Sequence, residues 1–224
     1  MSGEQLRKAR EHLGLTQQQA ASRWKLSQTY LSLMEGGKRR VPEPLARRLA
    51  RTDPSLATAL PPQLSSNAAK DLPALLGALG YPGFEYLARP GGVSNPAAVV
   101  LTALKGHDVP PRVTEALPWV LMTFPGLDWK WLVAEAKLAN LQNRLGYVVS
   151  LASELAGAGD GARAVAHLEA VRAQLEDARL ANEDTLGRNV TEVERQYLRQ
   201  HRPDAAAHWN LLTTLRADDL RYGH

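Results

Sequence analysis

The sequence contains no cysteine and no long apolar run. The absence of cysteine excludes disulfide bonds, thiolate metal sites and cysteine nucleophiles. No segment approaches the roughly 18 consecutive apolar residues that a membrane-spanning helix needs. The first ten residues, MSGEQLRKAR, have no apolar core of the kind found in signal peptides. We therefore expect a soluble cytoplasmic protein without a membrane segment.

Sequence signatures of catalysis are missing as well. The chain has no HExxH, GxxxxGK[ST] or GxSxG motif, and no GxGxxG motif follows a predicted strand. The glycines of GAGDG, residues 157–161, follow a predicted helix, which argues against a phosphate-binding loop. None of the six histidines has the spacing of a metal site. We therefore expect no enzyme, no metal and no cofactor.

Positive charge is concentrated near the N-terminus. The net charge is +4, but residues 1–60 hold 11 Lys/Arg and 5 Asp/Glu, so this quarter carries a net +6 and the remainder −2. This asymmetry suits contact between the N-terminal part and a polyanion, although a solvated basic surface would have the same composition.

Helix signals dominate the chain and predict an all-α fold. Thr16 with Gln19 and Thr191 with Glu194 form capping boxes, and Asn95 is an N-cap followed by proline. ALPPQLSSNAAK, residues 59–70, is the best candidate linker. It divides the chain into domains 1–58 and 71–224. In the second domain we predict helices at 71–80, 96–105, 112–124, 128–156 (with a possible break near Asn140), 161–181, 192–201 and 204–216.

Residues 4–51 predict four short amphipathic helices around one small core. Each has apolar residues at helical spacing, and the inward-facing set is Leu6, Ala9, Leu13, Ala20, Ala21, Trp24, Leu31, Met34, Leu45 and Leu49. A short turn at Lys25-Leu26 joins the second and third helices, and Ser27 caps the third. Two helices joined in this way are typical of a helix-turn-helix motif.

The N-terminal quarter resembles the Cro/C1-type (XRE) DNA-binding family, whose fold is lambda-repressor-like. The likeness is carried by Leu6, Arg7, Leu15-Thr16-Gln17, Ala20, Leu26-Ser27, Tyr30-Leu31-Ser32, Met34-Glu35-Gly36 and Lys38-Arg39-Arg40. Lys25 replaces the family's usual glycine and would need left-handed or distorted geometry. Trp24 is larger than the usual leucine. Leu33 lies about 200° from Leu31 around the helix, so it predicts a contact in the DNA groove or with another surface.

The resemblance implies a set of DNA contacts. The recognition helix would present Gln28 and Thr29 to base edges, where glutamine pairs with adenine and threonine touches a thymine methyl. Gln17 would meet phosphate at a helix start. The remaining contacts would go to the phosphate backbone. The full implied set is Gln17, Ser27, Gln28, Thr29, Tyr30, Ser32, Lys38, Arg39 and Arg40. Two copies on a palindromic operator are expected, so a homodimer is possible.

The C-terminal region holds four of the five tryptophans and a polar cluster within an apolar stretch. Asparagine and glutamine in a buried helix need hydrogen-bond partners. The cluster therefore either caps and packs internally or contacts a partner protein. The candidate partner residues are Trp129, Trp131, Asn140, Gln142, Asn143 and Arg144.

Residues 75–215 resemble regulators paired with AbiEii-like nucleotidyltransferase toxins. The segments that carry this likeness are NPAAVVLTALKG, EALPWVLMTFPGLDWKWLVAEAK, LQNRLGYVVSLA and HWNLL. The resemblance implies a repressor that is also an antitoxin, with C-terminal helices that bind the toxin. The alternative is a stand-alone XRE-type regulator whose C-terminal domain dimerises or senses a ligand.

Overall fold

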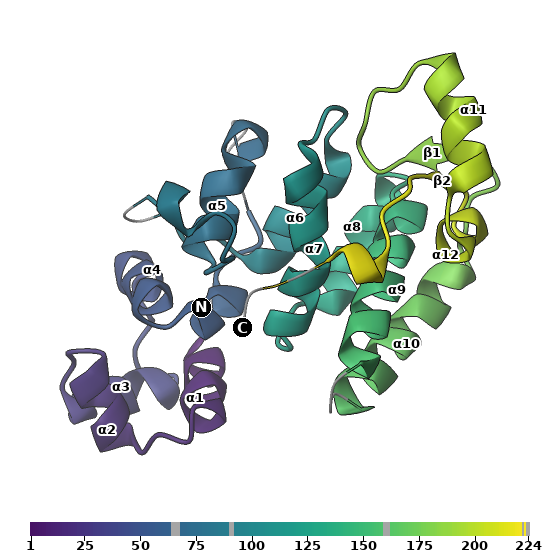
Figure 1. Ribbon diagram of the computed structural model, residues 1–224. Coiled ribbons are helices and arrows are strands. Elements are labelled where there is room, and N and C mark those ends of the chain that lie inside the picture. Colours follow the sequence, from purple (N-terminus) through teal and green to yellow (C-terminus); the bar gives the residue numbers. More distant parts are fainter. Residues whose placement is uncertain (64–67, 90–91, 159–161, 221, 223–224) are drawn as a thin grey trace.

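The computed structural model describes residues 1–224 except 64–67, 90–91, 159–161, 221 and 223–224 (Figure 1). The described part is built almost entirely of helices, with one parallel pair of two-residue strands, which confirms the predicted all-α class. Two sequence predictions fall partly outside the described residues. They are the linker at 59–70, through its residues 64–67, and the loop at 157–161, through its residues 159–161.

Four helices form an N-terminal cluster: α1 (Gly3–His12), α2 (Gln17–Arg23), α3 (Gln28–Glu35) and α4 (Glu43–Thr52). Side-chain caps start the first three, because Ser2, Thr16 and Ser27 each accept a hydrogen bond from the backbone N–H three residues later. The capping box predicted at Thr16 and Gln19 is present. Local sequence signals thus place these helix starts.

The turn between α2 and α3 is left-handed at Lys25, whose φ is 53°. This confirms the left-handed geometry expected where the family usually has glycine. A non-glycine residue in this region is strained, and the backbone bond from Leu26 N–H to Ala21 O, 2.8 Å long, holds the turn closed. Trp24 is buried beneath it.

The helices of the cluster lie close together around a common core. Leu6, Ala20, Leu31 and Met34 are fully buried. Gly3 lies so near α3 that a Cβ atom there would stand 1.8 Å from the Met34 carbonyl oxygen. The first turn of α1 therefore fits against α3 only because residue 3 has no side chain.

A short 3₁₀ helix, η1 (Pro54–Ala59), joins the cluster to the rest of the chain. Leu56 and Ala57 are fully buried in it. The Asn95 side-chain nitrogen donates to the carbonyl oxygens of Thr58 (3.1 Å) and Leu60 (2.6 Å). Asn95 also caps the following helix through Ala97 N–H. Hydrogen bonds from Asn95 therefore hold the end of η1 and Leu60 against the start of α6.

The C-terminal body continues with further helices and the two strands. Their bounds are η2 (Ala68–Asp71), α5 (Leu72–Ala78), η3 (Glu85–Leu87), α6 (Pro96–Lys105), α7 (Pro111–Thr123), α8 (Trp129–Leu138), α9 (Gln142–Gly157), α10 (Ala162–Glu176), β1 (Asp184–Thr185), α11 (Glu192–His201), α12 (Asp204–His208), β2 (Leu211–Leu212) and η4 (Ala217–Asp219). In Figure 1 the purple helices α1–α3 occupy one end of the molecule and α11 the other.

Helix α9 is the centre of the body. Every residue from 141 to 153 is buried, and α7, α8 and α10 pack around it. A helix that is buried on all faces is mostly apolar, and any polar side chain on it needs a hydrogen-bond partner within the protein. The predicted break in 128–156 is confirmed, because Asn140 has a φ of 58° between α8 and α9.

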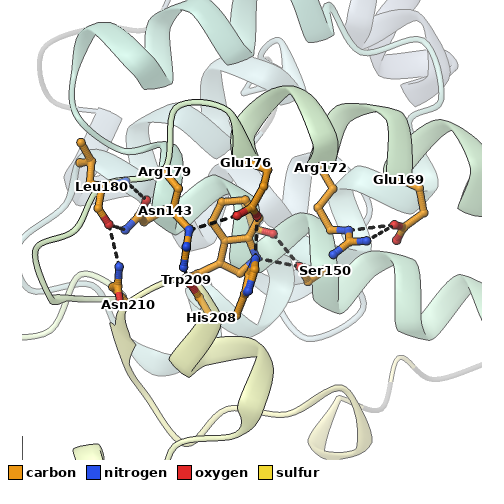
Figure 2. A network of polar contacts seen from close by, with 11 residues as sticks. Asn143, Ser150, Glu169, Arg172, Glu176, Arg179, Leu180, His208, Trp209 and Asn210 are labelled. Carbon is orange, nitrogen blue, oxygen red and sulfur yellow. Dashed lines mark hydrogen bonds and ion pairs between the residues drawn. The ribbon is translucent and has the colours of Figure 1, made fainter.

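Two predicted helices are shorter than expected. The segment 204–216 is helical only to His208, because Asn210 adopts a φ of 53° and residues 211–212 pair in parallel with 184–185. The segment 161–181 is helical only to Glu176, because the backbone of Leu180 bonds to the side chain of Asn143 in both directions. Figure 2 shows the hydrogen bonds between Asn143 and Leu180. It also shows the hydrogen bonds that join the C-terminal segment to the rest of the body, from His208 to Glu176 on α10, from Trp209 to Ser150 on α9 and from Asn210 to Leu180.

Candidate nucleic-acid interface

Helix α3 presents one polar face to solvent. Ser27 accepts a hydrogen bond from Tyr30 N–H at 3.2 Å and so starts the helix. Gln28, Thr29 and Ser32 are exposed, whereas Leu31 and Met34 on the other side are fully buried. The first turn of α3 thus has free side-chain donors and acceptors on a helix whose inner face is fixed.

Glu35, at the last turn of α3, is the internal anchor of the cluster. Its side chain is only 3 % exposed and accepts from Arg10 Nε at 2.7 Å and from Arg10 Nη2 at 3.1 Å. It also accepts from Gln17 Nε2 at 2.8 Å. These hydrogen bonds raise the pKa of Arg10 and keep its guanidinium charged. One carboxylate therefore connects α1, α2 and α3.

This network bears on the predicted role of Gln17. One side-chain N–H of Gln17 is used by Glu35, and the residue is half-buried. Arg10, which the sequence did not nominate, supplies the counter-charge and also donates to the Leu15 carbonyl oxygen at 2.8 Å. The structure therefore places Gln17 in contact with the carboxylate that supports α3, as well as at the start of α2.

The basic loop after α3 lies beside the same helix. Gly37, with a φ of 69°, turns the chain out of α3, and Lys38, Arg39 and Arg40 follow it, all exposed. Arg39 N–H donates to the Leu33 carbonyl oxygen at 3.0 Å. The Arg39 guanidinium carbon lies 5.1 Å from the centroid of the Tyr30 ring, which is a cation–π contact. This contact places a cation next to the first turn of α3.

Leu33 lies outside the fully buried face of α3. It is half-buried, whereas Leu31 is completely buried. This agrees with the helical geometry, which separates the two side chains by about 200°. An apolar side chain therefore stands next to the exposed polar face.

The polar cluster of α9 has internal partners, which corrects the expectation of partner contact for three residues. Gln142 Nε2 donates to the Ala178 carbonyl oxygen at 3.0 Å. Asn143 bonds the backbone of Leu180 (Figure 2). Arg144 pairs with Asp184 at 2.6 Å and donates to two carbonyl oxygens of the α6 end. All three residues are buried and bond within the protein, and among their polar atoms Gln142 Oε1 is buried without a hydrogen-bond partner.

The other three candidate partner residues have different surroundings. Asn140 is exposed at the left-handed turn that ends α8. Trp129 and Trp131 are half-buried at the start of α8, and the Trp129 ring lies 5.7 Å from the ring of His167 on α10. Trp129 and Trp131 lie at the start of α8 and Asn140 just after its end, so these residues do not form one contiguous group with residues 142–144.

Comparison with known families adds one finding to this geometry. Residues 3–52 match a family model described as a helix-turn-helix domain. The match covers helices α1 to α4, and the helix-turn-helix domain agrees with a DNA-binding regulator. It does not extend to residues 75–215, whose resemblance to partners of AbiEii-like toxins receives no support. No curated protein and no solved structure matches the chain.

Two other kinds of feature are absent from the described residues. None of the described helices is long and apolar enough to cross a membrane. Within the same part of the chain, no group of three or more acidic or histidine side chains is arranged to hold a metal ion. The polar face of α3 and its basic loop therefore remain the strongest candidate site.

Proposed function

We propose that the protein is a transcription regulator that binds operator DNA through residues 1–58 and is a binding protein, not an enzyme. One observation carries the proposal. Gln28 and Thr29 are exposed on the first turn of α3, whose other end is held by the buried Glu35 carboxylate. A recognition helix must be rigid on one side and polar on the other, because its first turn contacts base edges in the major groove.

The proposed contacts divide into two kinds. Gln28 and Thr29 read base edges and determine sequence preference. The phosphate contacts come from Ser27, Tyr30 and Ser32 on α3, from the basic loop at Lys38, Arg39 and Arg40, and from the start of α2 at Gln17. The net +6 of residues 1–60 supports this division, because phosphate contact requires cations. A dimer on a palindromic operator would double the small contact area of one such domain.

Changing both Gln28 and Thr29 to alanine is expected to weaken operator binding by at least roughly 30-fold, because two lost base contacts, worth about 1–3 kcal/mol each, sum to about 2 kcal/mol or more. Binding to unrelated duplexes should change little. The operator is selected from random duplexes with the unaltered protein, and both affinities are then measured by titration across a salt series.

The matched comparison is a protein with Arg39→Gln and Arg40→Gln. These changes should weaken binding to all duplexes alike and reduce the slope of log affinity against log salt by about 2, since each phosphate contact contributes about 0.9. If the Gln28→Ala, Thr29→Ala protein keeps its operator preference, the assignment of α3 as the recognition helix is wrong.

We further propose that the regulator is a repressor and the antitoxin of a nucleotidyltransferase-like toxin, as the resemblance of residues 75–215 implies. An exposed stripe on α11 supports a protein partner. Val193 and Tyr197 are 78 % and 57 % exposed and lie four residues apart on one helix face. Leu198 is buried on the other face, and Arg199 and Arg202 pair with Glu183. The stripe is therefore presented on a fixed helix.

Tyr197→Ala is expected to weaken the toxin complex by at least about 30-fold, because exposed aromatic anchors dominate protein interfaces. The full chain is co-expressed with the product of the neighbouring reading frame, and the affinity of the purified pair is measured. Tyr86→Ala is the matched control, since Tyr86 is 77 % exposed on η3. If the product of the neighbouring reading frame does not co-purify with the chain, the antitoxin proposal is wrong and the stand-alone regulator is supported instead.

A further inference from the structure

A cavity of about 410 Å³ lies where the helix-turn-helix domain meets the C-terminal body. Helix α1 forms one wall, η1 the second, and the connection between α7 and α8 the third. Its volume is within the range of small-molecule sites, about 300–1,000 Å³. The lining residues are Gln5, Lys8, Ala9, Ser55, Thr58, Ala59, Thr123, Phe124, Pro125 and Gly126.

The lining combines apolar walls with one cationic side chain. Ala9, Ala59, Phe124 and Pro125 supply apolar surface, and none of the described lining residues is acidic. Lys8 contributes an ammonium group whose salt bridge with Glu4 is exposed and uses one of its three protons. The Gln5 side-chain oxygen accepts from Ser2 N–H at 2.7 Å. Lys8 therefore supplies the only charge among these lining residues, whereas the Ser55 and Thr58 hydroxyls already donate to Asp53 Oδ1 and to the Ser55 carbonyl oxygen.

Each side of the cavity is fixed to a different part of the molecule. Helix α1 is joined to the recognition helix by the Arg10–Glu35 pair and by the close approach of Gly3 to Met34. The η1 wall is joined to α6 of the body by Asn95. A molecule in the cavity would therefore touch the DNA-binding part and the body at once.

We propose that this cavity is an effector site for a small apolar monocarboxylate, with an aromatic or aliphatic body against Phe124 and Pro125 and its carboxylate at Lys8. The inference goes beyond DNA recognition, since it assigns a ligand and a place of control. A ligand that binds only one arrangement of α1 against the body shifts operator affinity, and operator DNA shifts ligand affinity by the same factor.

The first test measures binding without DNA. Benzoate and hexanoate are titrated into the full chain by calorimetry, beside benzamide and hexanamide, which have the same bodies without charge. We expect dissociation constants on the order of 1 mM for the acids, because ligands of this size contribute little free energy. The amides should bind roughly tenfold more weakly, because they lose a charge-assisted hydrogen bond.

Two variants locate the site. Lys8→Gln should remove the preference for acid over amide. Gly126→Leu should abolish binding of all four compounds, because a Cβ at residue 126 would already be in van der Waals contact with Thr58, 3.4 Å from Oγ1, so the rest of the leucine side chain must occupy the cavity that both residues line. The matched controls are Lys130→Gln on α8 and Gly157→Leu at the end of α9, where a Cβ meets nothing within 4 Å. Both controls should bind like the unaltered protein.

The proposal is overturned if neither acid binds, if Gly126→Leu leaves the affinity unchanged, or if Lys8→Gln keeps the preference for acid. It is also overturned if bound benzoate changes operator affinity by less than about twofold, since coupling between linked sites is typically larger. Because binding is measured without DNA, a failure to find an operator would refute the proposed function and leave the cavity result standing.

Discussion

Glu35→Gln is expected to lower the free energy of unfolding by about 3–5 kcal/mol, since removal of one member of a buried ion pair leaves the other charge without compensation. Arg10, with a side chain only 11 % exposed, would keep its charge and lose its nearest counter-ion, leaving Glu11 at 3.6 Å. The loss is a large share of the total stability of a domain, about 5–15 kcal/mol. Urea unfolding of the full chain should show a lower midpoint, and operator binding should fall with it.

Glu43→Gln is the matched control for this result. Glu43 pairs with Arg47 at 2.9 Å, but both side chains are more than half exposed on α4. Solvent screening limits such a pair to about 1 kcal/mol or less. If the two variants lose equal stability, the Glu35 carboxylate does not anchor α3, and the rigidity that the proposed base contacts require must have another source.

Features of the fold that depend on neighbouring residues could be predicted from the sequence. Helix starts depend on residues three or four apart, so the caps at Thr16, Ser27, Asn95 and Thr191 predicted real helices. The bounds of α6 and α11 were predicted to the residue. The resemblance to the helix-turn-helix family implied exposed side chains at Gln28 and Thr29, and both are exposed. These features require no knowledge of distant segments.

Features that depend on distant segments were missed. The partners of Gln142, Asn143 and Arg144 lie 36 to 40 residues away in the chain. Periodicity contains no information about such pairs, so the sequence left internal packing and partner contact open for these residues, and the structure favours internal packing. The Arg10–Glu35 pair, 25 residues apart, and the cavity beside α1 escaped prediction for the same reason. Candidate site residues could be named, but the groups that support them could not.

The shortened helix at residues 204–208 has a tertiary cause that can be tested. Trp209 follows it directly and is 1 % exposed, and its indole nitrogen donates to Ser150 Oγ at 3.0 Å on α9 (Figure 2). Asn210 then bonds the Leu180 carbonyl oxygen at 2.7 Å. Burial of the indole against α9 therefore outweighs the local preference for a longer helix. This burial also attaches the C-terminal segment to the body.

Trp209→Ala should consequently lower the free energy of unfolding by about 3–5 kcal/mol, because it removes a fully buried aromatic side chain and leaves a cavity. The loss should appear as a lower midpoint of urea unfolding without a change in the slope. Phe in place of Trp209 should recover part of the stability and lose only the hydrogen bond to Ser150 and some contact area.

Gly146 provides the decisive comparison, because a Cβ at this position would stand 2.5 Å from the Trp209 ring. Gly146→Ala alone should therefore destabilise the protein by about 1–3 kcal/mol through overpacking. In the Trp209→Ala background the same change should stabilise it by up to about 1 kcal/mol, because the clash is gone and alanine favours a helix over glycine. A double-mutant cycle measures this reversal of sign. An equal effect of Gly146→Ala in both backgrounds would show that the indole does not pack on α9 at this point, and the tertiary explanation for the short helix would fall with it.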